Sequence, residues 1–352
     1  MNKPKLFSYF DPEYFTLEQK SLFARSPHYI GHELLVPYSN DYKVIEWMNN
    51  SHFMINNERK LHLISNICKH RQATMLHSRG NTNLIICPLH NWSYKTTGEF
   101  NFAPLFNSQP NCTNLDKEEL INWKGILFRP TRDIIADLKN SNLSKYIDFT
   151  NYQYSNTVIA EYTFNWKIFM EVYTEDYHVE AFHPGLGSFV DCKHLKWEFG
   201  DWYNVQAVAA KEHLSQYGSK LYAQWQQKIL QLSHGSLPKL GALWLTYYPN
   251  IMIECYPKCI VIAIAIPISS ELTKVVTEFY YPDEILSFDS EFVELHQQVY
   301  FETAKEDDEI CYQLHNGRKS LYLAGKEEDG PYQIPLESGL QHFHEFLVRE
   351  TY

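Results

Sequence analysis

Two short segments, each with one cysteine and one histidine, constrain this chain more than any other feature of its sequence. The segments read CKHR from Cys68 and CPLH from Cys87, so His70 and His90 are the imidazoles. A structural zinc finger usually groups two cysteines on one turn and two histidines on a following helix, whereas here thiol and imidazole alternate. If each segment gives one ligand to each of two irons, one iron takes both thiolates and the other takes both imidazoles. The pattern therefore predicts a mixed-ligand [2Fe-2S] cluster, with a zinc knuckle as the alternative.

The sequence around these segments predicts a small antiparallel β domain. Between residues 33 and 66, short apolar runs alternate with turns that contain Asn, Asp, Ser and Lys. The same pattern continues to residue 128. Before them, Asp11-Pro12 is typical of a helix start, and Ser26-Pro27 should end that helix. We place the boundary of this N-terminal helix and cluster domain near residue 150, which gives a domain of residues 1–150.

The remaining residues, 151–352, predict a second domain of the α+β class. Alternating apolar residues at 152–164 predict a strand, which is followed by helical periodicity at 166–177. Three or four strand-like runs lie between residues 243 and 281, and helical patterns follow at about 287–316 and 337–350. We therefore expect one mostly antiparallel sheet with helices segregated against it.

Composition excludes several classes of partner. Thirty-one Lys and Arg residues face 42 Asp and Glu residues, for a formal charge of -11, and no basic block is present, so we expect no nucleic-acid partner. The longest apolar run, 259–267, is about half of the ~20 residues that a spanning helix needs, so we expect no membrane insertion. No secretory leader is seen, and seven cysteines are odd and sparse, which together favour a reducing, cytoplasmic location.

A second pair of histidines predicts a second metal site. His178 and His183 are five residues apart in NWKIFMEVYTEDYHVEAFHPGL, and Pro184-Gly185 follows them. Residues i and i+5 diverge by about 140° on a helix, so the helix must end or bulge between the two histidines if both bind one metal. Two imidazoles and one carboxylate would form the facial triad that leaves positions on iron open for dioxygen.

Helical periodicity narrows the choice of the carboxylate to two residues. In the predicted helix 287–316, apolar residues such as Phe288 and Val299 share one face, and Glu306 and Asp307 fall within about 75° of its centre. Asp308 points nearly the opposite way. A solvated acidic patch is the alternative explanation for these residues.

These motifs together resemble the α subunits of Rieske non-haem iron oxygenases, particularly the group that acts on choline- and betaine-like compounds. The matching text includes CKHR, CPLHNWSY and the histidine segment, and EDDEICYQLHNG is similar to the family's Glu-Asp-x-x-Ile-Cys pattern, which selects Asp307 as the carboxylate ligand. The resemblance implies a Rieske domain, a helix-grip (START-like) catalytic domain and a mononuclear Fe(II) held by His178, His183 and Asp307. The cluster loops alone would also fit a Rieske ferredoxin or a respiratory-chain Rieske protein.

The resemblance also implies a carboxylate bridge between the two metal centres. Glu175 stands in the family's bridging position, and its partner would be His90 of a neighbouring subunit, so a homotrimer is expected. Glu171, Glu175 and His178 fall on one stripe of the predicted helix. Asp176 and Glu180 are alternatives for the bridge. Val172 and Gln72 depart from the family, which often has Asn and Gly there.

No Gly-rich dinucleotide fingerprint is present, so the chain should depend on a separate reductase, possibly with a ferredoxin. We expect an oxygenase that uses O2 to hydroxylate or N-demethylate a small organic substrate, as a monooxygenase or an aromatic ring-hydroxylating dioxygenase. The alternative from another class is a Rieske electron carrier or ligand-binding protein. Four aromatic residues could line a pocket or pack the sheet, and we favour packing: Tyr203, Trp244, Tyr247 and Tyr256.

Overall fold

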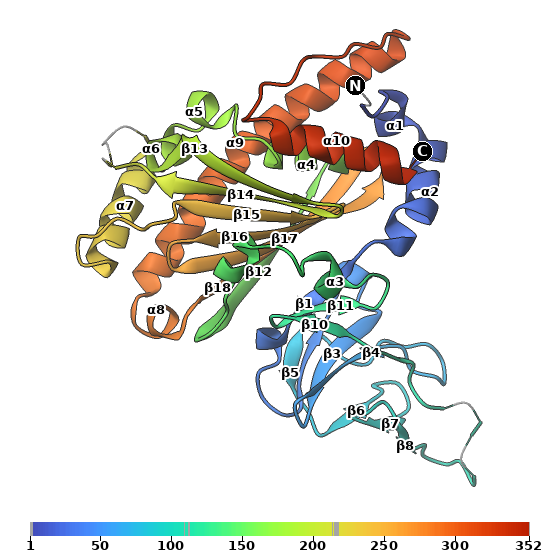
Figure 1. Cartoon of the computed structure of the whole chain (residues 1–352). Helices are drawn as coiled ribbons and strands as arrows, with labels where there is room; N and C mark the ends of the chain where they lie inside the picture. Colours follow the sequence, from blue (N-terminus) through green and yellow to red (C-terminus); the bar gives the residue numbers. More distant parts are fainter. Residues whose placement is uncertain (1–2, 109, 112, 213, 215–217, 352) are drawn as a thin grey trace. The chain divides into compact units, whose positions relative to one another are not determined.

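The computed structural model describes residues 3–108, 110–111, 113–212, 214 and 218–351, and it divides into two compact units (Figure 1). One unit is Pro27–Ile134, and the other combines the chain before Pro27 with the chain from Ile135 onward. In this division the N-terminal helices group with the C-terminal part, and the smaller unit ends at Ile134; the domain boundary near residue 150 stays a prediction. Buried contacts explain this: Lys167 Nζ lies 2.6 Å from Glu18 Oε1, and Asn165 Nδ2 donates to Tyr9 O at 2.9 Å.

The smaller unit is an antiparallel β structure, as the sequence predicted, and its described strands form three sheets. Their strand orders are β1-β11-β10, β5-β2-β3-β4-β9 and β6-β7-β8. The strands are β1 His28–His32, β2 Asp41–Val44, β3 His52–Asn57, β4 Lys60–Ser65, β5 Arg79–Asn81, β6 Leu84–Ile86, β7 Ser93–Lys95, β8 Phe100–Phe102, β9 Lys117–Glu118, β10 Ile121–Trp123 and β11 Ile126–Arg129. A core that includes Phe53, Ile64 and Tyr94 also buries both cysteines of the paired segments.

The larger unit contains a seven-stranded antiparallel sheet of order β12-β18-β17-β16-β15-β14-β13. Its strands are β12 Tyr152–Tyr162, β13 Val190–Gly200, β14 Tyr203–Ala210, β15 Ala242–Tyr247, β16 Ile251–Tyr256, β17 Cys259–Ser269 and β18 Leu272–Pro282. The central strands are buried along most of their length, because helix α9, Ser290–Leu323, packs apolar residues such as Phe292 and Val299 against one face (Figure 1). This is the predicted α+β class.

The other helical elements are α1 Phe7–Phe10, α2 Pro12–Ser21, α3 Ile134–Asp137, α4 Trp166–Tyr173, α5 Val179–Phe182, α6 Pro184–Phe189, α7 Lys220–Leu232, α8 Asp283–Phe288, α10 Ser338–Thr351 and the 3-10 turns at 23–25, 33–35, 46–48 and 143–146. Helix α2 begins as predicted, since the Asp11 carboxylate accepts from Glu13 N at 2.8 Å.

Phe288 does not lie on the buried face of α9. It ends α8, before the Asp289 cap, and it is 90 % exposed. Within the described residues, no helix is long and apolar enough to cross a bilayer.

Candidate metal centres and active site

The two cysteine-containing loops have the same backbone geometry. The N–H of Gln72 donates to Cys68 O at 3.1 Å, and the N–H of Asn91 donates to Cys87 O at 3.0 Å. The residue four positions after each cysteine has a left-handed backbone conformation, with φ of 56° at Gln72 and 58° at Asn91. Glycine takes this conformation without strain and asparagine takes it more readily than most residues. The structure therefore explains why the family often has glycine where this chain has Gln72.

The loops bring the four predicted cluster residues together within the smaller unit. Cys68 and Cys87 are buried, and the Tyr94 hydroxyl lies 3.3 Å from Cys68 Sγ. The rings of His70 and His90 have centroids 4.6 Å apart. The Nδ1 atom of His70 is buried and has no hydrogen-bond partner among the described residues, although burial of such an atom is costly. Two thiols, two imidazoles and this unpaired nitrogen fit a mixed-ligand cluster.

The predicted break between the paired histidines of the larger unit is present. Helix α4 ends at Tyr173, His178 precedes the short helix α5, and His183 lies between α5 and α6. The proline at 184 is the first residue of α6, a position where its missing N–H costs nothing. The short helix α5 thus separates the two histidines, and both imidazoles face Asp307 on helix α9.

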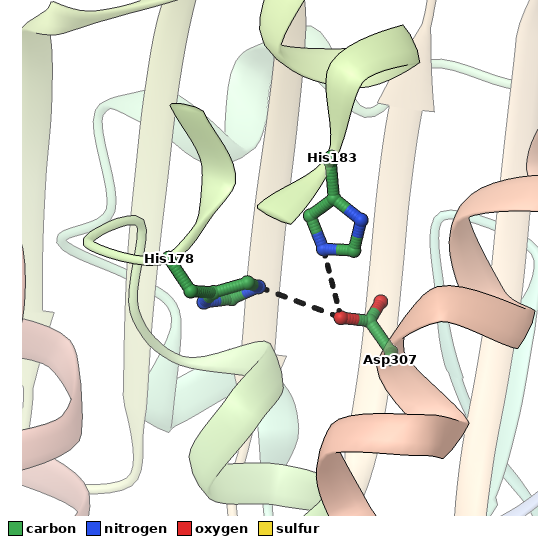
Figure 2. A group of neighbouring side chains, drawn as sticks. All are labelled: His178, His183 and Asp307. Atoms are coloured by element: carbon green, nitrogen blue, oxygen red, sulfur yellow. Dashed lines mark hydrogen bonds and ion pairs between the residues drawn. The ribbon is translucent and has the colours of Figure 1, made fainter. Parts of the chain in front are cut away.

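Asp307, in the middle of α9, lies opposite both imidazoles (Figure 2). Its Oδ1 atom is 3.4 Å from His178 Nε2 and 2.9 Å from His183 Nε2. One ligand atom from each of the three residues lies within 4.8 Å of the others. This is the donor set of a two-histidine, one-carboxylate triad, and it suits a divalent iron with open positions.

Each imidazole is oriented by a second carboxylate at its other nitrogen. Glu175 Oε1 contacts His178 Nδ1, and Glu306 Oε2 lies 2.7 Å from His183 Nδ1. Such contacts fix the ring and leave Nε2 free for a metal. Sequence periodicity left Glu306 and Asp307 as rival ligands. In the structure both reach His183 from opposite sides, while Asp307 alone of the two also reaches His178.

The charges of the site compensate one another. Burial raises the pKa of Asp307, but contacts with His178 and His183 outweigh burial and hold it below its ordinary value. Burial lowers the pKa of His178, yet Asp307 and Glu175 raise it to about 10. Three carboxylates thus stabilise positive charge at this point, as a site for a divalent cation requires.

One prediction about nearby acids needs correction. Glu171 does not share a stripe with Glu175 and His178, because α4 ends between them and Glu171 points into the core, where it pairs with Arg318. Of the alternatives to Glu175, the carboxylate of Glu180 is 45 % exposed and lies 3.8 Å from Lys211.

Asp176, the other alternative, is buried beside the triad. Burial and the charge of Glu175 raise the pKa of Asp176 to about 7, although His178 opposes them. Its Oδ2 atom is buried and has no partner among the described residues. Asp176 and Glu175 both line the cavity that opens beside the triad.

This cavity has a volume of about 110 Å³ and lies between the sheet and α9, with α4 to α7 around it. Aromatic side chains form much of its wall: Phe169, Tyr173, Phe189, Tyr222, Trp225, Trp244, Tyr256 and Tyr300. The prediction that Trp244 and Tyr256 only pack the sheet is therefore wrong. Among the described lining residues there are four carboxylates, Glu175, Asp176, Glu254 and Asp307, and neither lysine nor arginine. Strand alternation alone did not distinguish a cavity wall from a packed core.

Comparison with known families identifies both units. The model for the "Ring hydroxylating alpha subunit (catalytic domain)" matches residues 149–351, and the "Rieske [2Fe-2S] domain" model matches residues 27–113. The chain belongs to the α-subunit family of Rieske non-haem iron oxygenases. It is an oxidoreductase whose family carries a Rieske cluster and a mononuclear iron, and these oxygenases act on small substrates with O2 and a separate electron donor. An electron carrier with a mere ligand-binding domain does not agree with the catalytic-domain match.

Individual proteins of named activity are similar to this oxygenase over most of its length. The putrescine 2-hydroxylase of Ralstonia nicotianae is 45 % identical over 342 residues, covering 97 % of this chain and 93 % of the relative. The putrescine 2-hydroxylase of Bordetella bronchiseptica is 43 % identical, covering 97 % and 83 %. The quaternary ammonium Rieske monooxygenase CntA, solved with an inhibitor, shares the fold with a TM-score of 0.81 and 18 % identity, covering 99 % of this chain and 95 % of that one.

Proposed function

We propose that this oxygenase hydroxylates a small alkyl diamine of the putrescine kind. The observation that carries the proposal is the charge of the cavity beside the triad, whose described lining has four carboxylates and no lysine or arginine. Two of these carboxylates, Asp176 and Glu254, pair with no histidine among the described residues. A ligand with two ammonium groups compensates their charges, and aromatic rings add favourable contacts with cations and methylene groups. The two putrescine 2-hydroxylases support the same substrate class. A neutral aromatic substrate, as for a ring-hydroxylating dioxygenase, would leave the buried carboxylates uncompensated.

We assign the metal ligands from the donor sets. Cys68, His70, Cys87 and His90 would hold the cluster, and the triad would hold the mononuclear iron. When bound, the iron supplies the activation of O2 and the cluster supplies electrons. The chain's own residues bind the substrate, orient the imidazoles and exclude water from the cavity.

Glu175 would act between the two centres. Its carboxylate already contacts His178 Nδ1, and it accepts from His178 N at 3.2 Å. It is partly exposed, so a histidine of another subunit could reach it. We therefore propose that His90 of a neighbouring chain contacts Glu175 in a head-to-tail homotrimer. A separate NAD(P)H-dependent reductase, possibly with a ferredoxin, would donate the electrons, and the cysteine usage of the sequence favours a cytoplasmic location.

Product analysis with labelled oxygen tests the proposed reaction. Purified protein is supplied with iron, a compatible reductase, NADH, putrescine and ¹⁸O2, and the products are separated and weighed by mass spectrometry. We expect a hydroxylated diamine that carries one labelled oxygen atom, and no such product with the His178→Ala variant. Failure to oxidise putrescine, together with labelled diol formation from aromatic hydrocarbons, would refute the diamine assignment in favour of a ring dioxygenase.

A further inference from the structure

Glu254 is a fully buried carboxylate in the wall of the cavity, and the mechanism described so far does not use it. It lies on β16, and its side chain is 2 % exposed. Its Oε2 atom accepts from the Tyr256 hydroxyl at 2.6 Å, and its Oε1 atom accepts from the Tyr300 hydroxyl at 3.0 Å. Trp244 Nε1 in turn donates to the Tyr256 oxygen at 2.9 Å. Three aromatic residues therefore hold this carboxylate in a fixed orientation.

No positive side chain compensates Glu254 within the described part of the chain. Burial raises its pKa to about 7, although the hydroxyls of Tyr256 and Tyr300 lower it, and the charge of Asp307 raises it further. Burial of an unpaired carboxylate costs several kcal/mol, so such groups usually have a cationic partner. Two other buried glutamates of this unit have such a partner: Glu18 pairs with Lys167, and Glu171 with Arg318.

Strand register places further acceptors on the same face as Glu254. Gln206 pairs with Trp244, which pairs with Glu254, so the three side chains form one row across β14, β15 and β16. All three line the cavity. The Oε1 atom of Gln206 is buried and unpaired among the described residues, as is the hydroxyl of Tyr173, another lining residue. An ammonium group has three N–H donors, and this wall offers several acceptors.

Aromatic rings complete the surroundings of Glu254. The ring of Tyr256 lies 6.2 Å from Trp244, 6.3 Å from Tyr300 and 5.8 Å from His296, measured between centroids. Rings of this kind attract a cation over their faces. Burial lowers the pKa of His296 to about 3, so this imidazole is neutral and does not repel a cation.

We propose that Glu254, held by Tyr256 and Tyr300, binds the ammonium group at the non-reacting end of an alkyl diamine. The inference rests on the proposed function, and it adds the residue that recognises the substrate. Glu254 is suited to this end of the ligand because it lies on β16, whereas the triad residues lie around α5 and on α9. Asp176, the other carboxylate of the lining that pairs with no histidine, belongs to the iron end, where it interacts with Glu175 and His178.

The test compares the binding of putrescine with that of 1,4-butanediol, which has the same length and no charge. Calorimetry is run on the iron-loaded protein under argon without reductase, so that no turnover occurs. Glu254→Gln should weaken putrescine binding by about 10- to 100-fold, because a hydrogen bond to a charged group is lost. Binding of 1,4-butanediol and the iron content should stay at wild-type values. Glu254→Asp, which keeps the charge, should retain more putrescine affinity than Glu254→Gln.

Glu278→Gln is the matched control. Glu278 is also a buried glutamate of the same sheet that accepts from a tyrosine, the Tyr280 hydroxyl at 2.6 Å, but it does not line the cavity. This variant should bind putrescine like the wild type. The inference is refuted if Glu254→Gln binds putrescine within twofold of the wild type, or if it loses both ligands equally, since Glu254 would then only shape the cavity.

A turnover assay on the wild type separates this inference from the proposed function. If the wild type binds putrescine through Glu254 but yields no hydroxylated product, the ammonium site stands and the proposed reaction fails. If the wild type hydroxylates putrescine and Glu254→Gln binds it equally well, the reaction stands and the ammonium site fails.

Discussion

Replacing Glu171 by glutamine should destabilise the larger unit and loosen the metal site that it carries. The Glu171 carboxylate accepts from the Tyr9 hydroxyl and from Arg318 on α9, and it lies 3.0 Å from His344 Nε2 on α10. It therefore ties α4, which precedes the first histidine of the triad, to α9, which carries Asp307. The side chain is 3 % exposed, so solvent screens these contacts little.

The size of this loss of stability follows from the shift in the pKa of Glu171. Burial raises the pKa of Glu171, but Arg318, His344 and Tyr9 outweigh it and hold the pKa at about 2, against an ordinary value of 4.5. Because the folded pKa is the lower one, the stabilisation is complete above about pH 4.5 and is lost as the pH falls toward 2. It amounts to about 3 kcal/mol at pH 7 and about 2 kcal/mol at pH 3.5. Removing one partner of a buried ion pair costs about the same.

Calorimetric melting of wild type and Glu171→Gln at pH 7 and pH 3.5 measures this difference. For a unit of this size, about 3 kcal/mol corresponds to a fall in Tm of roughly 6–12 °C. The control is Glu161→Gln, since Glu161 pairs with Lys274 at 3.2 Å but is 54 % exposed, and it should change stability by less than about 0.5 kcal/mol. The reasoning fails if Glu171→Gln melts with the wild type at pH 7, or if its deficit is larger at pH 3.5 than at pH 7.

Three further predictions concern the metal centres directly. Glu306→Gln should weaken iron retention by about 10- to 100-fold, because His183 loses its orienting carboxylate, and competition with a chelator measures this; unchanged retention would contradict the role. Glu175→Gln should keep both metal centres, seen by iron analysis and electron paramagnetic resonance, yet nearly abolish product formation; retained turnover would assign the bridge to another acid. His178→Ala should lower the iron content from about three to about two per chain without altering the cluster spectrum, and three irons in the variant would exclude His178 as a ligand.

The sequence predicted those features that depend on short-range spacing. Within each cluster segment the cysteine and the histidine are two or three residues apart, and His178 and His183 are five residues apart. Pro184 indicates where the helix must end. The class of the fold followed from changes of hydrophobic period along the chain. The choice of Asp307 as the carboxylate ligand needed further information, because periodicity left two acids on one helix face. The family resemblance chose between them.

Long-range partners could not be predicted in the same way. Nothing in the local sequence of Glu171 indicates that Arg318, far along the chain, compensates its charge, and the stripe predicted for this helix continued beyond its actual end. Trp244 and Glu254 alternate with core residues on adjacent strands, and alternation reports only which face a side chain occupies. Whether that face meets a packed helix or a cavity depends on the tertiary structure.

The acidic lining of the cavity also has a consequence for the end of the catalytic cycle. Under the proposed function, hydroxylation of the diamine would add an oxygen atom and leave both amino groups protonated, so product and substrate would have the same charge. The electrostatic attraction that retains one would therefore retain the other, and departure of the product should be slow. Competitive inhibition by accumulated hydroxydiamine is the kinetic signature expected of such a wall.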